Sequence, residues 1–227
     1  MNHNYVQTAN VKSLVTSLNR LHTMDRKTNR MALVYGEHGL GKTEGVVQFG
    51  ANNSAAIYLR AKALTSPRWF LEDLVKELGE QPLYRSSALF TQAKEQLERY
   101  PRMLLVDEAD YLLHDTRAME TLRDLHDTTP CSICIVGMEG IKNKLARFRH
   151  LFDRFAEVVE FTHLTLNDIK NVTVQNCEVK MAEDACAFIH RNTPRFRQLN
   201  NWMRKAEHLA RTNNLKEITA AHLEGRR

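Results

Sequence analysis

The sequence predicts an α/β fold, a parallel five-stranded sheet with flanking helices, followed by a small helical domain. Short apolar segments alternate with segments of helical periodicity through most of the 227 residues. One of them, residues 103–106, is apolar at every position, as expected for a strand covered on both faces. After residue 166 only helical patterns remain. We therefore expect an α/β domain over residues 1–163 and a helical lid domain over residues 164–227.

The individual elements follow from hydrophobic periodicity and from the glycine, proline and polar residues that interrupt it. The expected strands cover residues 31–35, 55–59, 103–106, 132–136 and 158–161. The expected helices cover residues 42–50, 69–78, 88–100, 116–128, 166–176, 182–191, 195–211 and 219–224. Before the first strand, Asn10 is the expected cap of a leader helix. The apolar stripe of that helix comprises Val11, Leu14, Val15, Leu18 and Leu21.

Composition and charge limit the classes of function. The chain is 43% hydrophobic and 26% charged, which is ordinary for a soluble protein. We expect no transmembrane helix, no secretion signal and a cytoplasmic location, because no long apolar run is present. Residues 191–227 carry 9 Lys/Arg and 3 Asp/Glu, whereas the rest of the chain is close to neutral. A basic end of this kind suits a polyanionic partner, and it suits a solvated helix face equally well.

Cysteine usage favours a structural role for the thiols. Cys131 and Cys134 have the spacing of a metal or redox pair. No second pair follows at zinc-ribbon spacing, and the surrounding segment has the pattern of a buried strand. We therefore expect these two, with Cys177 and Cys186, to be small buried apolar residues.

A glycine-rich segment after the first expected strand fits G-x-x-x-x-G-K-[ST] at every defined position. Its residues are Gly36, Glu37, His38, Gly39, Leu40, Gly41, Lys42 and Thr43. The glycines allow backbone N–H groups to surround a phosphate, and the loop opens a helix, whose N-terminus favours anions. We expect it to bind ATP, with Lys42 on the β- and γ-phosphates and Thr43 on Mg²⁺.

The apolar third strand leads directly into two acidic residues. Asp107 would lie at the carboxyl end of the strand, where it can hold Mg²⁺ through water. Glu108 would then polarise the attacking water as a general base. With the phosphate loop upstream, this pair predicts an ATP-hydrolysing enzyme.

The order of these parts resembles that of AAA+ ATPases. The resemblance covers nearly the whole chain and implies an arginine finger near Arg154, with Arg147 and Arg149 as alternatives. Such an arginine reaches the γ-phosphate bound by a neighbouring subunit, so it implies a homo-oligomer. The resemblance also makes Arg195, at the start of a lid helix, a second sensor that contacts the phosphates of its own subunit.

Ordinary surface roles remain open for both arginines. Arg154 could pair with Asp153, Glu157 or another carboxylate, and Arg195 could be a solvated helix residue. The chain also departs from the family pattern at the end of the fourth strand. That position normally carries a polar first sensor, and here the residues are Gly137, Met138 and Glu139.

Within the AAA+ family the chain most resembles DNA transposition regulators of the MuB and TnsC type. The resemblance rests on three segments, YVQTANVKSLVTSLNRL, IYLRAKAL and TPRFRQLNNW. It implies a protein that assembles with ATP on double-stranded DNA, as a ring or helical filament, and recruits or activates a transposase. It also implies a bacterial host, with a phage or mobile element as the source, and an adenine contact near Val6.

The loop after the second strand lines the DNA in such regulators. Candidate contacts here and in the next loop are Arg60, Lys62, Arg68 and Arg85. Single cations on loops suit sequence-independent contact with phosphates, although each could be an ordinary exposed side chain. Two further functions stay open: a helicase loader or replication-initiation ATPase, and a protein-remodelling ATPase without a nucleic-acid role.

Overall fold

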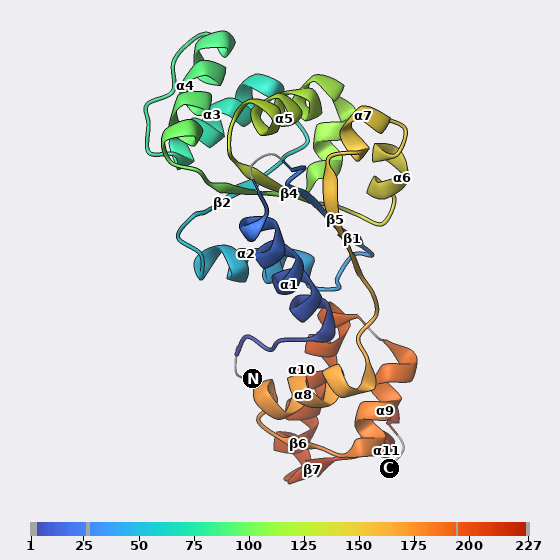
Figure 1. Cartoon of the computed structure of the whole chain (residues 1–227). Helices are drawn as coiled ribbons and strands as arrows, with labels where there is room; N and C mark the ends of the chain where they lie inside the picture. Colours follow the sequence, from blue (N-terminus) through green and yellow to red (C-terminus); the bar gives the residue numbers. More distant parts are fainter. Residues whose placement is uncertain (1–3, 26–27, 194, 226–227) are drawn as a thin grey trace. The chain divides into compact units, whose positions relative to one another are not determined.

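The structure is a computed structural model, drawn in Figure 1, that describes most of the chain. The described residues are 4–25, 28–193 and 195–225. They form two compact units, which we describe separately. The sheet unit contains Leu14–Gly36 and Lys42–Glu160. The helical unit contains Glu37–Gly41, Phe161–Arg227 and Met1–Ser13, as far as these are described. The domain boundary expected near residue 163 stays a prediction.

A five-stranded sheet forms the centre of the sheet unit, in the order β2-β3-β4-β1-β5. The strands are β1 (Met31–Gly36), β2 (Ala56–Arg60), β3 (Met103–Asp107), β4 (Ser132–Val136) and β5 (Phe155–Phe161). β1 pairs with β4, β4 with β3 and β3 with β2, all in parallel. Every residue of β1, β3 and β4 is buried, as expected for a parallel sheet covered on both faces. The predicted α/β class is confirmed.

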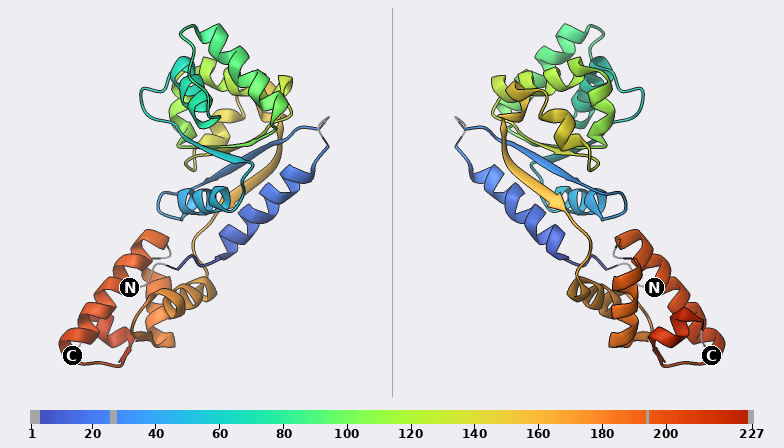
Figure 2. Two further views of the ribbon diagram at one scale, coloured as in Figure 1. Left: turned by 90° about the vertical axis from the view of Figure 1, so that its left-hand side faces the viewer. Right: turned by 90° about the vertical axis from the view of Figure 1, so that its right-hand side faces the viewer.

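Helices cover both faces of this sheet (Figures 1 and 2). They are α2 (Lys42–Ala51), α3 (Pro67–Glu77), α4 (Ser86–Arg99) and α5 (Thr116–Thr128). α2 lies on one face, whereas α3 and α5 lie on the other, with α4 packed against α3. Alternate strand residues such as Leu33, Leu104 and Ile133 join Leu74 and Leu122 in the core beneath α3 and α5.

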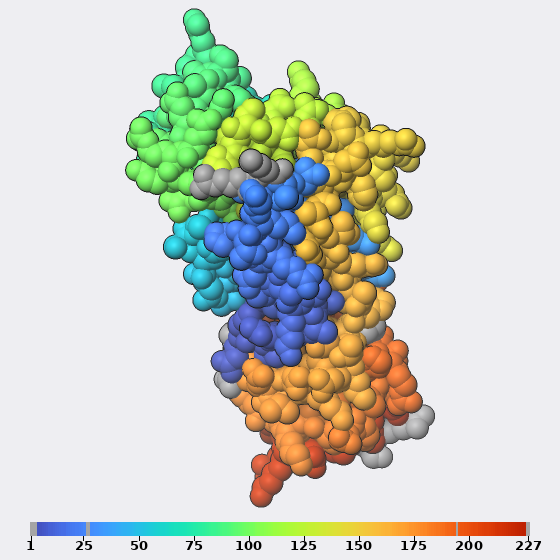
Figure 3. Space-filling model, in the orientation of Figure 1, coloured from blue at the N-terminus to red at the C-terminus, as the bar shows by residue number. Residues whose placement is uncertain are grey.

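The leader helix α1 (Ala9–Thr23) carries the predicted apolar stripe, since Leu14, Leu18 and Leu21 are fully buried. From Leu14 onward it lies beside β5 in the sheet unit (Figure 3), where Arg20 Nη1 lies 3.9 Å from Glu157 Oε1.

The expectation that Asn10 caps α1 is wrong, because the helix begins one residue earlier. The Asn10 side chain instead clamps the backbone of Thr162, donating to its carbonyl oxygen over 2.7 Å and accepting from its N–H over 3.1 Å. The N–H of Ala9 is satisfied by Asp168 Oδ1 at 2.9 Å.

Several short elements lie between the predicted ones. They are η1 (Ala109–His114), α6 (Ile141–Leu145), α7 (Arg149–Phe152), β6 (Lys180–Met181) and β7 (Glu217–Ile218). None is long enough to show hydrophobic periodicity in a sequence. β5 also begins three residues before its predicted start at residue 158.

Four helices dominate the helical unit: α8 (Leu166–Asn176), α9 (Glu183–Asn192), α10 (Phe196–Asn213) and α11 (Ala220–Glu224). A capping box starts α8, in which Thr165 Oγ1 accepts from the N–H of Asp168 and the Asp168 carboxylate accepts from the N–H of Thr165. Ile169, Ile189 and Met203 are fully buried in the core of this unit.

The thiols are unpaired, and Cys131, Cys134 and Cys186 are buried as predicted. Cys177 is only partly buried. Burial raises the pKa of Cys131 to about 11, so this thiol stays protonated at neutral pH. None of the helices within the described ranges combines the length and hydrophobicity that crossing a bilayer requires.

Candidate functional site

The candidate phosphate loop connects β1 to α2. β1 ends at Gly36 and α2 begins at Lys42, so the predicted strand–loop–helix arrangement is present. Gly39 and Gly41 have φ angles of +83° and +94°, in the left-handed region that other residues rarely adopt. A backbone of this kind can direct successive N–H groups toward one anion.

The ammonium group of Lys42 is held against the start of the loop. Lys42 is 9% exposed, and its Nζ donates a hydrogen bond to the carbonyl oxygen of Gly36 over 2.7 Å. Thr43 follows in the first turn of α2 and is exposed to solvent. The loop therefore presents one buried cation and one accessible hydroxyl next to each other.

Glu37, the second residue of the loop, forms an ion pair with Arg195. Arg195 is the N-cap residue of α10, which agrees with its predicted place at the start of a lid helix. His163 Nε2 lies 3.4 Å from Glu37 Oε2. The hydrogen bond from His163 and the positive charge of Arg195 lower the pKa of Glu37, so its carboxylate is ionised at neutral pH.

The next loop residues contact the first turn of α10. Arg197 Nη1 donates to His38 Nε2 over 2.8 Å, and the backbone N–H of Arg197 donates to the carbonyl oxygen of Gly39 over 3.1 Å. A methyl group placed on Gly41 would lie 3.9 Å from Phe196 Cγ, so this ring lies close to the loop. Two lid arginines thus contact the loop residues that the G-x-x-x-x-G-K-[ST] pattern leaves undefined.

Asp107 is the last residue of β3 and is 3% exposed. Its Oδ2 accepts a hydrogen bond from the Tyr58 hydroxyl over 3.0 Å, and its Oδ1 accepts from the N–H of Glu108 over 2.8 Å. Burial, followed by the charge of Asp107, raises the pKa of Tyr58, so the phenol stays a neutral donor. Each carboxylate oxygen keeps a second lone pair for a water molecule.

Glu108 has a backbone conformation that is uncommon for its residue type. Its φ of +55° and ψ of +33° lie in the left-handed region, where a residue with a side chain pays a steric cost. Residues held in this way concentrate at functional sites. The Glu108 carboxylate is partly exposed, and Arg60 Nη2 lies 3.5 Å from its Oε1.

These groups fit a nucleoside triphosphate with Mg²⁺. The loop supplies a glycine-rich backbone and the Lys42 ammonium for phosphate oxygens. Thr43 and Asp107 supply the hard oxygen ligands that Mg²⁺ prefers. β1 and β3 belong to the same parallel sheet, so Gly36 and the acidic pair both lie at its carboxyl edge, where ligands of open α/β sheets bind.

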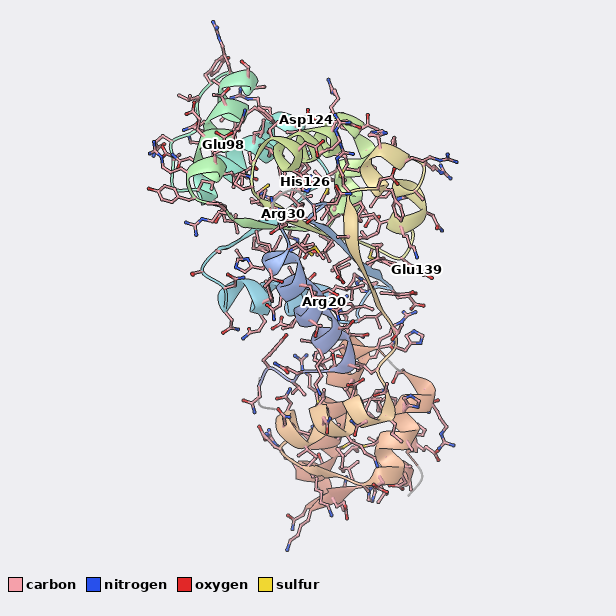
Figure 4. All side chains as sticks on the ribbon, viewed as in Figure 1. Arg20, Arg30, Glu98, Asp124, His126 and Glu139 are labelled. Atoms are coloured by element: carbon pink, nitrogen blue, oxygen red, sulfur yellow. The ribbon has the colours of Figure 1, made fainter. Side chains whose placement is uncertain are left out.

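The end of β4 lacks a polar first sensor, as the sequence predicts. The N–H of Met138 donates to Asp110 Oδ2 over 2.6 Å, and the N–H of Gly137 donates to the carbonyl oxygen of Val34 over 2.9 Å. Glu139 is exposed, at the turn before α6 (Figure 4). Asp110 fixes this turn from η1, a role that the sequence did not indicate.

Arg154 makes an ion pair with Asp127, from the last turn of α5. Its Nε lies 2.8 Å from Asp127 Oδ1 and its Nη2 lies 2.5 Å from Oδ2, and the guanidinium also donates to the carbonyl oxygen of His150. The sequence left a surface pairing with Asp153, Glu157 or another carboxylate open for this residue, and the partner is Asp127. The guanidinium is thus engaged within its own chain, and its role as an arginine finger stays a prediction.

Arg147 and Arg149 are both exposed. Within the described ranges neither side chain makes a hydrogen bond or an ion pair. Both side chains are accessible, and their role as the alternative arginine finger stays a prediction.

The four candidate DNA contacts fall into two groups. Arg60 and Arg68 are engaged: Arg60 pairs with Glu108, and Arg68 Nη2 lies 2.5 Å from Glu72 Oε1. Lys62 and Arg85 are exposed, and in the described part of the chain their side chains have no hydrogen-bond or ionic partner.

Arg68 also ties the two candidate DNA loops together. It donates to the carbonyl oxygen of Tyr84, and its guanidinium lies 5.2 Å from the centre of the Tyr84 ring. Lys62 in the β2–α3 loop and Arg85 at the end of the α3–α4 loop are therefore attached to one linked pair of loops.

Val6 and Tyr58 are the remaining residues of the candidate site. Val6, the candidate adenine contact, is 6% exposed and packs in the core of the helical unit with Leu164 and Ile169, and its adenine role stays a prediction. Tyr58 was not anticipated. Its contact depends on the pairing of β2 with β3, which sets Arg60 opposite Asp107 and Tyr58 diagonally across from it.

Comparison with protein families gives a match to the AAA domain over residues 24–145, more than half of the chain. Among known proteins, the ATP-dependent target DNA activator B of Escherichia phage Mu is 27% identical over 176 residues, which cover 74% of this chain and 54% of the relative. The protein of the same name from Escherichia phage D108 matches to the same extent. The chain thus spans about half the length of these relatives.

Solved structures share the fold. ORC1 of Aeropyrum pernix, in complex with DNA, has a TM-score of 0.66 at 17% identity, over 97% of this chain and 65% of its own. Cdc6p of Pyrobaculum aerophilum has a TM-score of 0.70 at 16% identity, over 96% and 66%. Domain III of the replication initiation protein DnaA of Thermotoga maritima has a TM-score of 0.60 at 18% identity, over 96% and 91%.

At these identities the solved structures support the architecture alone. The family match includes the phosphate loop and the acidic pair, and the sheet order and flanking helices agree with it. This protein therefore belongs to the AAA family of P-loop NTPases.

Proposed function

We propose that this protein is an ATPase that binds double-stranded DNA without sequence preference, assembles on target DNA in the presence of ATP, and recruits or activates a transposase. The 27% sequence identity over 74% of the chain with two phage proteins named ATP-dependent target DNA activator B carries this proposal. A phage or other mobile element is the proposed source, and the bacterial cytoplasm, where its DNA lies, is the proposed place of action.

The nucleotide site is the best-defined part of the proposal. The backbone of residues 36–41 and the Lys42 ammonium would bind the phosphates. Thr43 and Asp107 would hold Mg²⁺, which supplies positive charge to the phosphate oxygens. Tyr58 donates to Asp107 and so orients this carboxylate, as residues behind a metal ligand usually do.

In the hydrolysis step, water attacks the γ-phosphorus and the bond from this phosphorus to the β,γ-bridging oxygen breaks. ADP is the leaving group, and the γ-phosphoryl group becomes inorganic phosphate. Glu108 accepts the proton of the attacking water, as its place directly after Asp107 allows. Arg60 pairs with Glu108, which would hold the carboxylate away from full use as a base until a DNA phosphate competes for the guanidinium. The absence of a polar first sensor after β4 fits a slow basal rate.

Assembly would bring an arginine of one subunit to the γ-phosphate of the next. Arg147 and Arg149 suit this role because both are exposed and lack a partner among the described residues. An arginine supplied by a neighbour stabilises charge in the transition state and makes hydrolysis depend on assembly. The assembled form would be a ring or a helical filament.

DNA contact is proposed for the linked β2–α3 and α3–α4 loops. Lys62 and Arg85 provide exposed cations for phosphates, while Arg68 holds the loops together through Tyr84. Charges of this kind give salt-sensitive binding without base readout.

The decisive experiment measures binding of the full chain to a fluorescent random-sequence duplex, with ATP, with ADP and without nucleotide. We expect tight binding with ATP only, and filaments or rings by electron microscopy. Lys42→Ala should lose both the ATP-dependent DNA binding and the assemblies, because the ammonium that binds the phosphates is gone. Glu108→Gln should bind DNA and stay assembled, because it retains ATP. Equal DNA affinity with and without nucleotide would overturn the proposal.

A matched pair of arginines on α4 tests the DNA surface. Arg85 precedes the helix, and Arg99 lies in its last turn, about 20 Å away. Arg85→Ala should weaken DNA binding and lower the salt slope by about one counterion, whereas Arg99→Ala should change neither. Equal effects of the two substitutions would remove the loops from the DNA interface.

The same assay separates the competing functions. A preference for single-stranded DNA would favour a helicase loader or replication initiator. No response to DNA of any kind would favour a protein-remodelling ATPase.

A further inference from the structure

The ion pair between Glu37 and Arg195 joins a residue of the phosphate loop to the candidate second sensor arginine. Glu37 follows Gly36 directly in the phosphate loop, and Arg195 precedes the first turn of α10. Both residues belong to the helical unit, which includes Glu37–Gly41. A guanidinium held by Glu37 is therefore one residue away from the loop backbone that would bind phosphate.

The surroundings of Glu37 stabilise its negative charge. His163 belongs to the segment between β5 and α8, and its Nε2 lies 3.4 Å from Glu37 Oε2. The carboxylate also lies close to the N-terminus of α10, because it pairs with the N-cap residue of that helix, and such positions favour anions. Glu37 thus provides an anion in the place where a lid arginine meets the loop.

A carboxylate and a phosphate are alternative partners for one guanidinium. Arginine forms forked hydrogen bonds with either group, and a single guanidinium cannot make its full set with both. Arg195 is 42% exposed and Glu37 is 34% exposed, so solvent and ligands reach the pair. Arg197 keeps the first turn of α10 at the loop through His38 and Gly39 independently of this pair.

We propose that Glu37 is a positioning residue that holds Arg195 at the phosphate loop before nucleotide binds and releases it to the γ-phosphate of ATP. This inference rests on the proposed nucleotide site. In the nucleotide-free protein the ion pair keeps the guanidinium in place. ATP must then compete with the Glu37 carboxylate, so the pair weakens ATP binding while it orders the lid arginine.

The test is a double-substitution cycle with fluorescent ATP and ADP analogues as probes. Glu37→Gln should tighten ATP binding about two- to fivefold, the range that a partly exposed ion pair contributes, and should leave ADP binding nearly unchanged. Glu37→Asp keeps the carboxylate and should restore wild-type affinity. In an Arg195→Met background, Glu37→Gln should have no effect on ATP affinity.

Glu44→Gln is the matched control. Glu44 lies in the first turn of α2, is exposed, and has no hydrogen-bond or ionic partner in the described residues. This substitution removes the same charge near the loop, and its effect should be equal for ATP and ADP and independent of Arg195. The difference in ATP affinity between the two variants then separates the effect of the ion pair from the general effect of removing a negative charge near the loop.

Three results would overturn the inference while leaving the nucleotide site intact. They are weaker ATP binding by Glu37→Gln, an equal gain for ATP and ADP, and a gain that persists in the Arg195→Met background. Failure of the nucleotide site looks different, because wild type would then bind no ATP, or Lys42→Ala would bind it as well as wild type does.

Discussion

The Arg60 guanidinium lies 3.5 Å from the Glu108 carboxylate, at the carboxyl ends of two neighbouring strands. The register of β2 and β3 sets Arg60 opposite Asp107, one residue before Glu108. One ion pair thus connects a candidate DNA contact with the candidate general base. A DNA phosphate that attracted Arg60 would leave Glu108 free to act on water.

Replacing Arg60 by alanine should therefore have two effects. DNA affinity should fall, and hydrolysis without DNA should rise about two- to fivefold, because the carboxylate loses a partly exposed partner. Stimulation of hydrolysis by DNA should be lost. The measurement is phosphate release with and without a saturating duplex.

Lys62→Ala is the control for the Arg60 substitution. Lys62 follows Arg60 by two residues, and in the described part of the chain no hydrogen bond or ion pair joins its side chain to Glu108. Its loss should therefore weaken DNA binding and leave basal hydrolysis unchanged. If both substitutions gave the same basal rate, the ion pair would have no part in hydrolysis.

Tyr58→Phe tests the hydrogen bond behind Asp107. The substitution removes one hydroxyl and leaves the carboxylate without a donor at Oδ2. We expect the Mg²⁺ concentration for half-maximal hydrolysis to rise about tenfold, as is typical when the support of a metal ligand is removed. Tyr100→Phe is the control, since Tyr100 is 56% exposed. An unchanged Mg²⁺ requirement in Tyr58→Phe would show that Asp107 needs no such support.

Local patterns predicted the parts of the site that lie close together in the sequence. The phosphate loop and the Asp107–Glu108 pair are defined by short segments, and each has the expected strand beside it. The succession of strands and helices was predictable for the same reason, since each element has its own periodicity.

Contacts across the sheet and between helices were not predictable from one sequence. Tyr58 reaches Asp107 only because β2 pairs with β3, and Arg154 meets Asp127 27 residues earlier in the chain. Asn10 has the residue type of a helix cap, yet its amide is used to hold Thr162. Which partner a polar side chain finds depends on tertiary packing.

Arg154→Ala should affect stability rather than hydrolysis. The ion pair with Asp127 is about one-third exposed, so we assign it roughly 1 kcal/mol after allowing for solvent screening. The melting temperature should then fall by about 2–4 °C. Arg149→Ala, five residues earlier, should leave the melting temperature unchanged.

Either Arg147→Ala or Arg149→Ala should reduce hydrolysis by the assembled protein by about 10³-fold.

The pH dependence of this ion pair has a definite sign. The hydrogen bond from Arg154 lowers the pKa of Asp127 from 3.8 to about 2. The stability that depends on this carboxylate is therefore present above pH 3.8 and is lost as the pH falls toward 2. The difference between wild type and Arg154→Ala should shrink as the pH falls from about 4 toward about 2. A difference unchanged at low pH would mean that Arg154 stabilises the protein by packing.

His126 should make stability fall on mild acidification. It lies beside Arg30 (Figure 4), its Nε2 accepts from the N–H of Arg30 over 3.1 Å, and its Nδ1 therefore carries the proton shared with Asp127 Oδ1. Burial lowers the pKa of His126 below 6.5. The hydrogen bond and the charge of Asp127 oppose this shift, whereas the positive charges of Arg30 and Arg154 add to it. A second proton on the ring would remove the acceptor for the Arg30 N–H.

Because the folded-state pKa of His126 is depressed, its contribution to stability is complete above pH 6.5 and is lost as the pH falls below that value. Glutamine can place an oxygen near the position of Nε2 and does not titrate. Urea unfolding should therefore show wild type losing more stability than His126→Gln between about pH 7 and about pH 5. His22→Gln, at an exposed position of α1, should follow the wild-type curve. Parallel curves for wild type and His126→Gln would mean that the buried ring titrates equally in the folded and unfolded chain.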